Sequence, residues 1–189
     1  MKKREKQKPI ILKRLVVVTC GSTIKDNEGH EVLSTSGWTQ MDRMASKIFD
    51  LVLWPSRYSV TVMTASDIAS QQAGSTISGY FRGKSTKDRP IKVRRHRDRD
   101  LSNGTNEYGQ VWKMINKKAI KNDFLVLVVD RSTMSNLPAW LADNMAGRLT
   151  SGISYDQIDE PMAIEFHTEK CSCCDTIRMA LFEPGIIRL

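Results

Sequence analysis

The chain lacks any apolar run close to the roughly 20 residues that a membrane-spanning helix needs. Its N-terminal segment, residues 1–14, is basic, and its apolar stretch covers only residues 9–12. Such a stretch is too short for the core of a signal peptide. Because the segment contains Glu5 and no serine, it also differs from a typical transit peptide. These absences favour a cytoplasmic protein.

Cysteine is scarce and is not spaced as in a disulfide framework. Three of the four cysteines are crowded into residues 171–174, and the fourth is Cys20. Reduced thiols in a reducing compartment are the simplest interpretation. The sequence leaves two alternatives for the crowded segment, a zinc site or an exposed hairpin tip with free thiols, because its ligand types suit zinc and its spacing does not. The candidate ligands are His167, Cys171, Cys173 and Cys174.

No complete phosphate-binding loop or catalytic triad is present. Residues 79–85 end in Gly-Lys-Ser, but three residues separate the glycines where the phosphate loop has four, and a predicted helix precedes them. We interpret this segment as a basic surface loop and expect no cofactor. His30 and His96 have no partners at the spacing of a ligand set or a triad, so we interpret both as ordinary loop histidines.

Length and composition indicate one globular domain with two basic segments. The chain has 189 residues, 40% of them hydrophobic, and a net charge of +8. Residues 1–14 contain seven Lys/Arg against one Glu, and residues 82–99 contain nine Lys/Arg against two Asp, so the remainder is acidic. We expect a flexible basic arm at residues 1–13 and a single domain at residues 14–189.

Basic segments of this kind attract nucleic acid, ribonucleoprotein or acidic protein surfaces, although a solvated tail and loop would have the same composition. The sequence does not predict an oligomeric state. The residues predicted to contact such a partner are Lys2, Lys3, Arg4, Arg94, Arg95, Arg97 and Arg99.

Apolar periodicity predicts strands alternating with helices, which is typical of an α/β sheet with helices on both faces. Pro138 fits only the first turns of a helix, so we expect the last helix to begin near Ser135. We therefore predict a three-layer αβα sandwich whose central sheet is mostly parallel and carries an antiparallel edge hairpin. The predicted strands cover residues 14–19, 58–63, 91–93, 124–129, 161–166 and 176–182, the helices 37–53, 66–80, 108–120 and 132–147, and the irregular segments 21–36 and 94–106.

The segment after the first predicted strand is the strongest candidate for a functional site. Leu15–Thr19 has the unbroken apolar pattern of a strand buried on both faces, and Cys20 and Gly21 follow it directly. In open α/β sheets, ligands bind beyond the carboxyl ends of such strands. Cys20 is either a nucleophile whose pKa a helix N-terminus lowers or a small buried residue. The Cys-x5-Arg loop of cysteine phosphatases is absent, since position 26 is Asp.

Several strings resemble the histidine phosphatase superfamily (phosphoglycerate mutase-like). In that family the first strand ends in Arg-His-Gly-Glu-Thr, and Leu-Thr-x-x-Gly-x-x-Gln opens the first helix. Here the first strand is followed by Cys20-Gly-Ser-Thr23, and Leu33-Ser-Thr-Ser-Gly-Trp-Thr-Gln40 opens the helix. The family's Ser-Asp-Leu-x-Arg-Ala-x-Gln corresponds to Ser66-Asp-Ile-Ala-Ser-Gln71, in which Ser66 or Asp67 can cap a helix. The family's Ser-His-Gly after a late strand corresponds to Asp130-Arg-Ser132.

The resemblance implies a phosphate pocket whose four functional positions have all changed. The family's two arginines fall on Thr19 and Ser70, its nucleophilic histidine falls on Cys20, and its second histidine falls near Arg131. Thr and Ser cannot replace the bidentate contacts that arginine makes with a phosphoryl group. Arg131 and the backbone of Gly21, Ser22 and Thr23 stay candidates for binding an anion.

The resemblance therefore implies a catalytically inactive member that acts as a binding or scaffold module. The alternative is a divergent phosphatase in which Cys20 serves as the nucleophile.

Overall fold

The computed structural model describes residues 13–51, 58–102, 108–111, 113, 115, 124–146, 161–170, 177–179 and 185–189. The predicted arm residues Lys2, Lys3 and Arg4 and the cysteines at 171–174 lie outside these ranges. None of the helices within them is long and apolar enough to cross a membrane.

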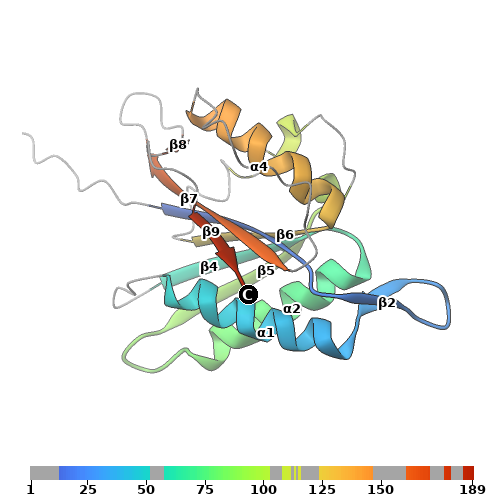
Figure 1. The fold of residues 1–189 in the computed structure, drawn as a ribbon. Coiled ribbons are helices and arrows are strands. Elements are labelled where there is room, and N and C mark those ends of the chain that lie inside the picture. The colour runs from blue at the N-terminus through green and yellow to red at the C-terminus, as the bar shows by residue number, and fades with distance from the viewer. Residues whose placement is uncertain are drawn as a thin grey trace, which may run out of the picture.

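A seven-stranded mixed sheet forms the centre of the fold (Figure 1). Four strands run parallel in the order β5-β4-β6-β1, and β7 continues the sheet antiparallel to β1. Both β8 and β9 pair antiparallel with β7. The strands are β1 (Lys13–Thr19), β4 (Tyr58–Thr64), β5 (Ile91–Arg97), β6 (Phe124–Val129), β7 (Met162–Lys170), β8 (Ile177–Met179) and β9 (Gly185–Arg188).

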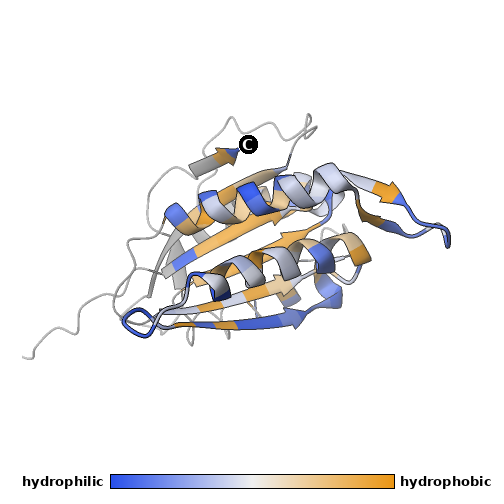
Figure 2. Ribbon diagram, turned by 90° about the horizontal axis from the view of Figure 1, so that it is seen from below, coloured by the Kyte–Doolittle hydropathy of each residue, from blue (hydrophilic) through white to orange (hydrophobic). Residues whose placement is uncertain are grey.

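Helices cover both faces of this sheet, so the predicted three-layer α/β architecture is confirmed (Figure 1). The helices α1 (Thr35–Asp50) and α2 (Ile68–Gly83) lie on one face, and α4 (Arg131–Ala146) lies on the other. A short 3-10 helix, η1 (Arg99–Leu101), follows β5. The sheet has an apolar core on each face, and alternate residues of β1 contribute to each. Val16 and Val18 pack beneath α1 and α2, while Leu15 and Val17 pack toward α4. Figure 2 shows the apolar strands behind α1 and α2.

The segment predicted as an irregular loop at residues 21–36 contains a short hairpin, β2 (Thr23–Lys25) and β3 (Glu31–Leu33). The carboxylate of Asp26 organises its turn by accepting hydrogen bonds from the N–H groups of Glu28 (2.9 Å) and His30 (2.8 Å). The hydrogen bond from the His30 N–H is the largest of the effects that lower the pKa of Asp26. Gly29 completes the turn with a φ of 83°. The prediction was wrong here because these strands are too short and too exposed to show a clear apolar alternation.

Two further predictions of the element boundaries were wrong. The strand predicted at residues 91–93 continues to Arg97, so residues 94–97 of the segment predicted as irregular at 94–106 belong to the edge of the sheet. The last helix begins at Arg131 rather than near Ser135, and Pro138 lies inside it. Asp130 caps this helix through a 2.7 Å hydrogen bond from the Thr133 N–H, which fixes its start upstream of the proline.

Arg14, counted within the basic N-terminal segment, is part of the folded core. Its guanidinium lies 2.7 Å from Glu165 on the neighbouring strand β7, and it also donates to the carbonyl of Leu51. This pair is largely buried, with 20% of the arginine side chain and 8% of the glutamate side chain exposed. Arg14 therefore holds β1 and β7 together and is not available to a polyanion.

Candidate functional site

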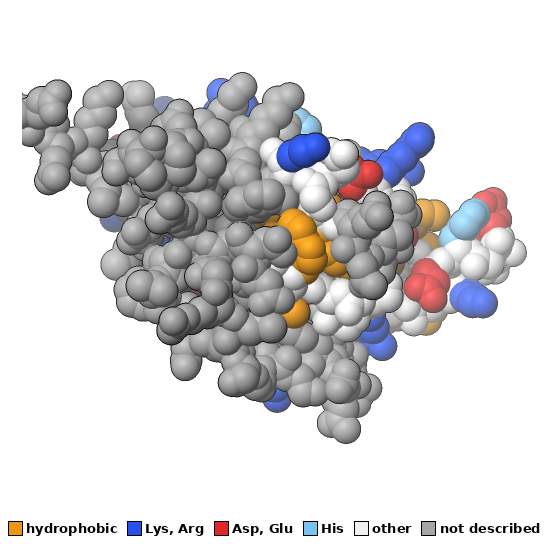
Figure 3. Space-filling view, turned by 90° about the horizontal axis from the view of Figure 1, so that it is seen from above, with side chains coloured by type: hydrophobic (Ala, Val, Ile, Leu, Met, Phe, Trp, Pro, Cys, Tyr) orange, Lys and Arg blue, Asp and Glu red, His pale blue; other side chains and the backbone are white. Residues whose placement is uncertain are grey.

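A pocket of about 340 Å³ lies where β1, β4 and β6 end and α2 and α4 begin. This is the carboxyl edge of the parallel strands, where the sequence places the candidate site. The hairpin β2–β3 contributes one wall, and it projects from the body of the molecule with its charged side chains in solvent (Figure 3). The lining residues are Cys20, Thr23, Glu31, Asp67, Asp130, Arg131 and Ser132.

The loop that follows β1 is held by the first helix. The side-chain oxygen of Gln40 accepts hydrogen bonds from the N–H (2.8 Å) and the hydroxyl (2.9 Å) of Ser22. Gly21 and Gly37 pack backbone to backbone, since a Cβ on Gly21 would lie 2.5 Å from the Gly37 carbonyl oxygen, and a Cβ on Gly37 would lie 2.1 Å from the Ser22 carbonyl oxygen. Ser34 caps α1 by accepting from the Gly37 N–H at 3.0 Å. The string that carries the first part of the family resemblance thus has a structural task in this chain, which is to fix the pocket floor.

The two positions assigned to the family's arginines do not line the pocket. Thr19 is completely buried, and its hydroxyl accepts a hydrogen bond from the Met162 N–H at 3.0 Å. Ser70 is also completely buried, and its hydroxyl has no hydrogen-bond partner within the described part of the chain. Thr19 therefore ties β1 to β7, and neither side chain can contact an anion in the pocket.

Two carboxylates occupy the helix N-termini that open onto the pocket. Asp67 caps α2 by accepting from the Ser70 N–H at 2.7 Å. Asp130 accepts from the N–H of Thr133 (2.7 Å) and the hydroxyl of Ser132 (2.8 Å) at the start of α4. A helix N-terminus attracts anions through its free N–H groups and its dipole. Here the carboxylates of Asp67 and Asp130 already accept hydrogen bonds from N–H groups at these N-termini.

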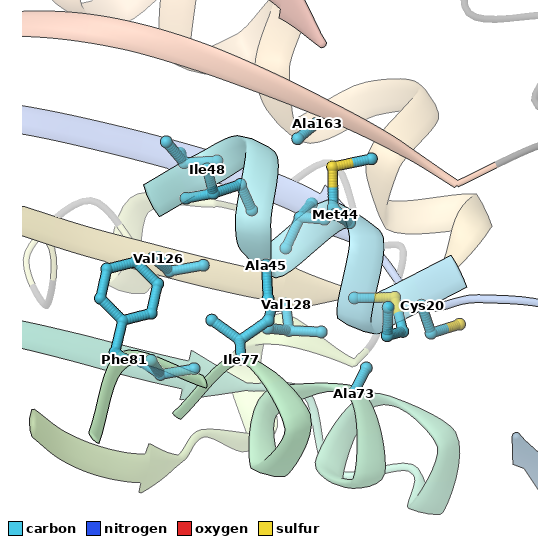
Figure 4. Packing of buried hydrophobic residues seen from close by; sticks show 14 of the residues in the cluster. Cys20, Met44, Ala45, Ile48, Ala73, Ile77, Phe81, Val126, Val128 and Ala163 are labelled. Carbon is cyan, nitrogen blue, oxygen red and sulfur yellow. The ribbon is translucent and has the colours of Figure 1, made fainter. Parts of the chain in front are cut away.

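Cys20 lies at the base of the pocket, at one end of the apolar cluster beneath α1 and α2 (Figure 4). Its side chain is almost fully buried, with 7% of the residue exposed. Burial raises the pKa of its thiol to about 12, and the negative charges of Asp67 and Asp130 act in the same direction. Arg131 acts in the opposite direction but does not offset them. Cys20 is therefore a neutral thiol at physiological pH, because the nucleophilic form of cysteine is the thiolate.

The charge balance of the pocket is acidic. Among the described residues, three carboxylates, from Glu31, Asp67 and Asp130, line it together with one guanidinium, that of Arg131. Phosphoryl groups carry negative charge, and like charges a few ångströms apart repel by about 1 kcal/mol or more per pair. The arrangement therefore suits a neutral or cationic group better than a phosphate.

The structure brings together only part of the predicted site. Cys20, Thr23 and Arg131 line the pocket, while Gly21 and Ser22 lie in the packed loop, and the Ser22 N–H is already bonded to Gln40. A role of these backbone groups in anion binding stays a prediction. The acidic lining residues were not predicted as part of the site, although Asp67 was recognised as a possible helix cap. The sequence signal for Asp130 is its place directly after a buried strand and three residues before Thr133.

The second basic segment, residues 82–99, carries exposed cations, and we call it the basic edge. Arg94, Arg95 and Arg97 lie on β5, at the edge of the sheet, and Arg99 follows in η1. All nine of its Lys/Arg residues are exposed, and within the described residues none of them forms an ion pair. The Arg95 guanidinium donates to the hydroxyl of Ser75 on α2.

The basic edge adjoins a second, smaller pocket of about 200 Å³. Tyr58 and Ile91, the first residues of β4 and β5, help to line it, so it lies at the amino ends of the strands. It is therefore at the opposite end of the sheet from the pocket around Cys20.

The zinc alternative falls outside the described residues. The cysteines at 171–174 are not described, and of His167 only the backbone, within β7, is described. Among the described residues no cluster of three or more His, Cys, Asp or Glu side chains forms a metal site. His30, interpreted as a loop histidine, lies beside Asp26 and Glu28 in the hairpin turn, with nitrogen–oxygen distances of 3.5 Å to each. His96 lies on β5 rather than in a loop.

Comparison with known proteins identifies the architecture. No protein-family model matches the sequence, and no curated protein matches it. The structure is similar to the protein histidine phosphatase SixA complexed with tungstate, with a TM-score of 0.59, 9% identity, and coverage of 93% of this chain and 96% of that one.

Two further solved structures agree with this likeness. A phosphohistidine phosphatase SixA from Agrobacterium tumefaciens has a TM-score of 0.55, 13% identity, and coverage of 95% and 99%. A mycobacterial glucosyl-3-phosphoglycerate phosphatase has a TM-score of 0.52, 10% identity, and coverage of 89% and 96%. The chain therefore has the fold of the histidine phosphatase superfamily.

Proposed function

We propose that this chain is a catalytically inactive protein with the histidine phosphatase fold and that it acts by binding a partner. The observation that carries the proposal is the state of Cys20 and its surroundings. The residue at the nucleophile position is a buried thiol with a pKa of about 12, and the carboxylates of Asp67 and Asp130 contribute to that high pKa. A phosphoryl-transfer site needs the opposite, an ionised or basic nucleophile among cationic clamps.

The residues that differ from the family pattern are integrated into the fold, which supports the proposal. Thr19 bonds to the backbone of β7, and Asp130 caps α4. Loss of a single electrostatic stabiliser typically costs about 3–4 kcal/mol of transition-state stabilisation. Here both arginine positions and both histidine positions have changed, so the combined loss would remove useful turnover.

The basic edge supports the binding half of the proposal. Its nine exposed cations have no ion-pair partners among the described residues, so they are free to meet an anionic surface. The partner under this proposal is an acidic protein, a nucleic acid or a ribonucleoprotein. Binding to any of these would weaken as the salt concentration rises.

A turnover assay tests the catalytic half of the proposal. The full chain is incubated with p-nitrophenyl phosphate across pH 5–9, beside a Cys20→Ser variant. We expect no phosphate release above the blank for either protein. Release that depends on the thiol and disappears in Cys20→Ser would contradict the proposal and establish the alternative, a divergent phosphatase with Cys20 as its nucleophile.

Capture of partners from native lysate, with and without nuclease, tests the binding half. A variant with Glu at 94, 95 and 97 removes the cations of β5, and a matched control places Glu at the exposed positions Lys25, Arg43 and Lys113. We expect the first variant alone to lose its partners. Equal retention by both variants would show that the basic edge does not carry the binding.

A further inference from the structure

We propose that β5 binds an acidic, extended protein segment as an added strand at the edge of the sheet. This inference rests on the proposed function in one respect, that the basic edge binds a partner, and it assigns the partner's chemistry and its mode of binding.

The first observation is that β5 is an open edge. It pairs with β4 alone, and within the described residues no strand lies on its other side. Figure 2 shows β5 as the outermost strand next to α2, hydrophilic over much of its length. An edge of this kind presents unpaired N–H and C=O groups that can template another strand.

The hydrogen bonds at the two ends of β5 show which of its backbone groups point away from β4. The N–H of Asp98 donates to the Thr64 carbonyl (2.9 Å), and the Pro90 carbonyl accepts from the Tyr58 N–H (3.3 Å). Because the N–H and C=O of one residue point to the same side of a strand and those of the next residue to the other, the even-numbered residues of β5 bond to β4. The odd-numbered residues Val93, Arg95 and Arg97 therefore direct their N–H and C=O groups away from the sheet.

These outward backbone groups have no partner in the described part of the chain. Ile91, one repeat earlier, has its N–H satisfied by the Ser85 hydroxyl at 2.9 Å. For Val93, Arg95 and Arg97 no such contact exists among the described residues. These three alternate residues each offer an N–H and a C=O, which is enough for a short ladder of hydrogen bonds to an added strand.

The second observation is that cations flank this edge on both faces of the sheet. Ile91 and Val93 pack toward α1 and α2, and Arg95 reaches Ser75 of α2, so the odd-numbered side chains lie on that face. The intervening side chains of Lys92 and Arg94 are exposed on the opposite face. A strand added to β5 would thus meet cations on either face, whichever way its side chains alternate.

This charge pattern selects the occupant. Opposite charges on neighbouring strands stabilise the pairing, and like charges oppose it. A second copy of the chain pairing through its own β5 would bring its own cations against these. Charged edges protect natural sheets from such self-association. An acidic segment is the strand that the same charges attract.

A nucleic acid fits this surface less well than an acidic strand, because it would contact the cations but not pair with the outward backbone groups. Single strands bind through stacked aromatic side chains as well as cations. Among the described residues the exposed large apolar side chains are Ile24, Trp38 and Ile68, and none of them lies in the basic edge. The nearby ring of Tyr80 is covered by the ammonium of Lys84, 5.2 Å from its centroid. The outward backbone donors would also have no regular partner on a phosphate chain.

The test separates backbone pairing from charge attraction. The full chain is titrated, by fluorescence anisotropy at low and high salt, with a labelled peptide Glu-Val-Glu-Thr-Glu-Val-Glu and with a labelled oligothymidine. Two variants are compared with the unchanged chain. Arg95→Ala removes one cation and keeps the outward N–H, while Arg95→Pro removes the same cation and the outward N–H. Proline is tolerated at edge positions whose N–H faces solvent.

We expect the peptide to bind, to bind more weakly at high salt, and to lose about tenfold more affinity in Arg95→Pro than in Arg95→Ala, a difference of about 1.4 kcal/mol. Equal binding of the peptide to the two folded variants would overturn the proposal. Binding of the oligothymidine without the peptide, or of neither probe, would overturn it as well. If Arg95→Pro fails to fold by circular dichroism, the pair Arg97→Pro and Arg97→Ala takes its place.

The outcome is independent of the catalytic half of the proposed function. Hydrolysis of p-nitrophenyl phosphate would refute inactivity and leave the peptide result standing. A failed peptide titration would refute strand addition and leave inactivity standing.

Discussion

The reactivity of Cys20 is the prediction that bears most directly on the pocket chemistry. With a pKa of about 12, only about one thiol in 10⁴–10⁵ is ionised at pH 7.5, against about one in ten for an ordinary cysteine. The thiolate fraction is thus lower by about three orders of magnitude. A more basic thiolate is also a better nucleophile, which recovers about 30-fold. We therefore expect alkylation of Cys20 to be about 100-fold slower than that of a free thiol, before its low exposure slows it further.

The assay follows alkylation by iodoacetamide with mass spectrometry, in a chain whose cysteines at 171, 173 and 174 are replaced by serine. Asp67→Asn removes the negative charge that raises this pKa most, and Asn still caps α2. We expect this variant to react faster, while Asp50→Asn, an exposed change at the far end of α1, reacts as the unchanged chain. Alkylation of native Cys20 within about threefold of an unfolded reference peptide would refute the reasoning.

The same raised pKa also predicts how stability depends on pH. Between about pH 9 and pH 12 the unfolded chain has lost the thiol proton and the folded chain retains it, so the free energy of unfolding falls as pH rises, by about 1.4 kcal/mol per pH unit. Cys20→Ala removes this contribution. Urea unfolding of both proteins from pH 7.5 to 10.5 should give a shallower decline for the variant, by about 2 kcal/mol in total. Parallel declines would contradict the assignment.

Two predictions concern the scaffold. A Cβ on Gly74 would lie 2.2 Å from the Thr64 methyl, so Gly74→Ala should destabilise by about 1–3 kcal/mol, while Gly79→Ala on the same helix, with nothing within 4 Å, should stabilise by about 0.5–1 kcal/mol. Denaturant unfolding measures both, and a shift of the same sign for both would refute the packing argument. Arg14→Met removes the guanidinium that pairs with the buried carboxylate of Glu165 and should cost about 3 kcal/mol. A second change, Glu165→Gln, should recover part of that loss, and no recovery would contradict the pairing.

Strong local patterns made much of the fold predictable. The apolar runs at residues 15–18 and 124–129 predict buried strands, and both lie side by side at the centre of the sheet. The string Ser34 to Gln40 predicts the start of α1, and it holds the loop after β1. These patterns succeed because their side chains are buried or cap a helix, so local sequence and tertiary packing agree.

The errors come from features that local patterns do not encode. The start of α4 depends on the cap from Asp130, which outweighed the proline signal at Pro138. The salt bridge from Arg14 depends on the pairing of β1 with β7, which brings together residues 151 positions apart in the chain. The hairpin β2–β3 is too short for an apolar period.

The acidic character of the pocket was the least predictable feature. Asp67 and Asp130 follow different strands, β4 and β6, and each can be read from sequence only as a helix cap. The strand order β4-β6-β1 brings both beside Cys20. The family resemblance implies which groups of the family pocket have changed, and the structure shows which charged residues line the pocket.

Oxyanion binding is the most direct test of the central proposal, that the pocket around Cys20 does not receive a phosphoryl group. Tungstate mimics that group whatever the substrate, and calorimetric titration into the full chain requires no turnover. A variant with Glu at 94, 95 and 97 removes binding to the basic edge, and Arg131→Ala removes the cation of the pocket. The account predicts no millimolar or tighter site that depends on Arg131. A submillimolar site that persists in the basic-edge variant and disappears in Arg131→Ala would contradict it.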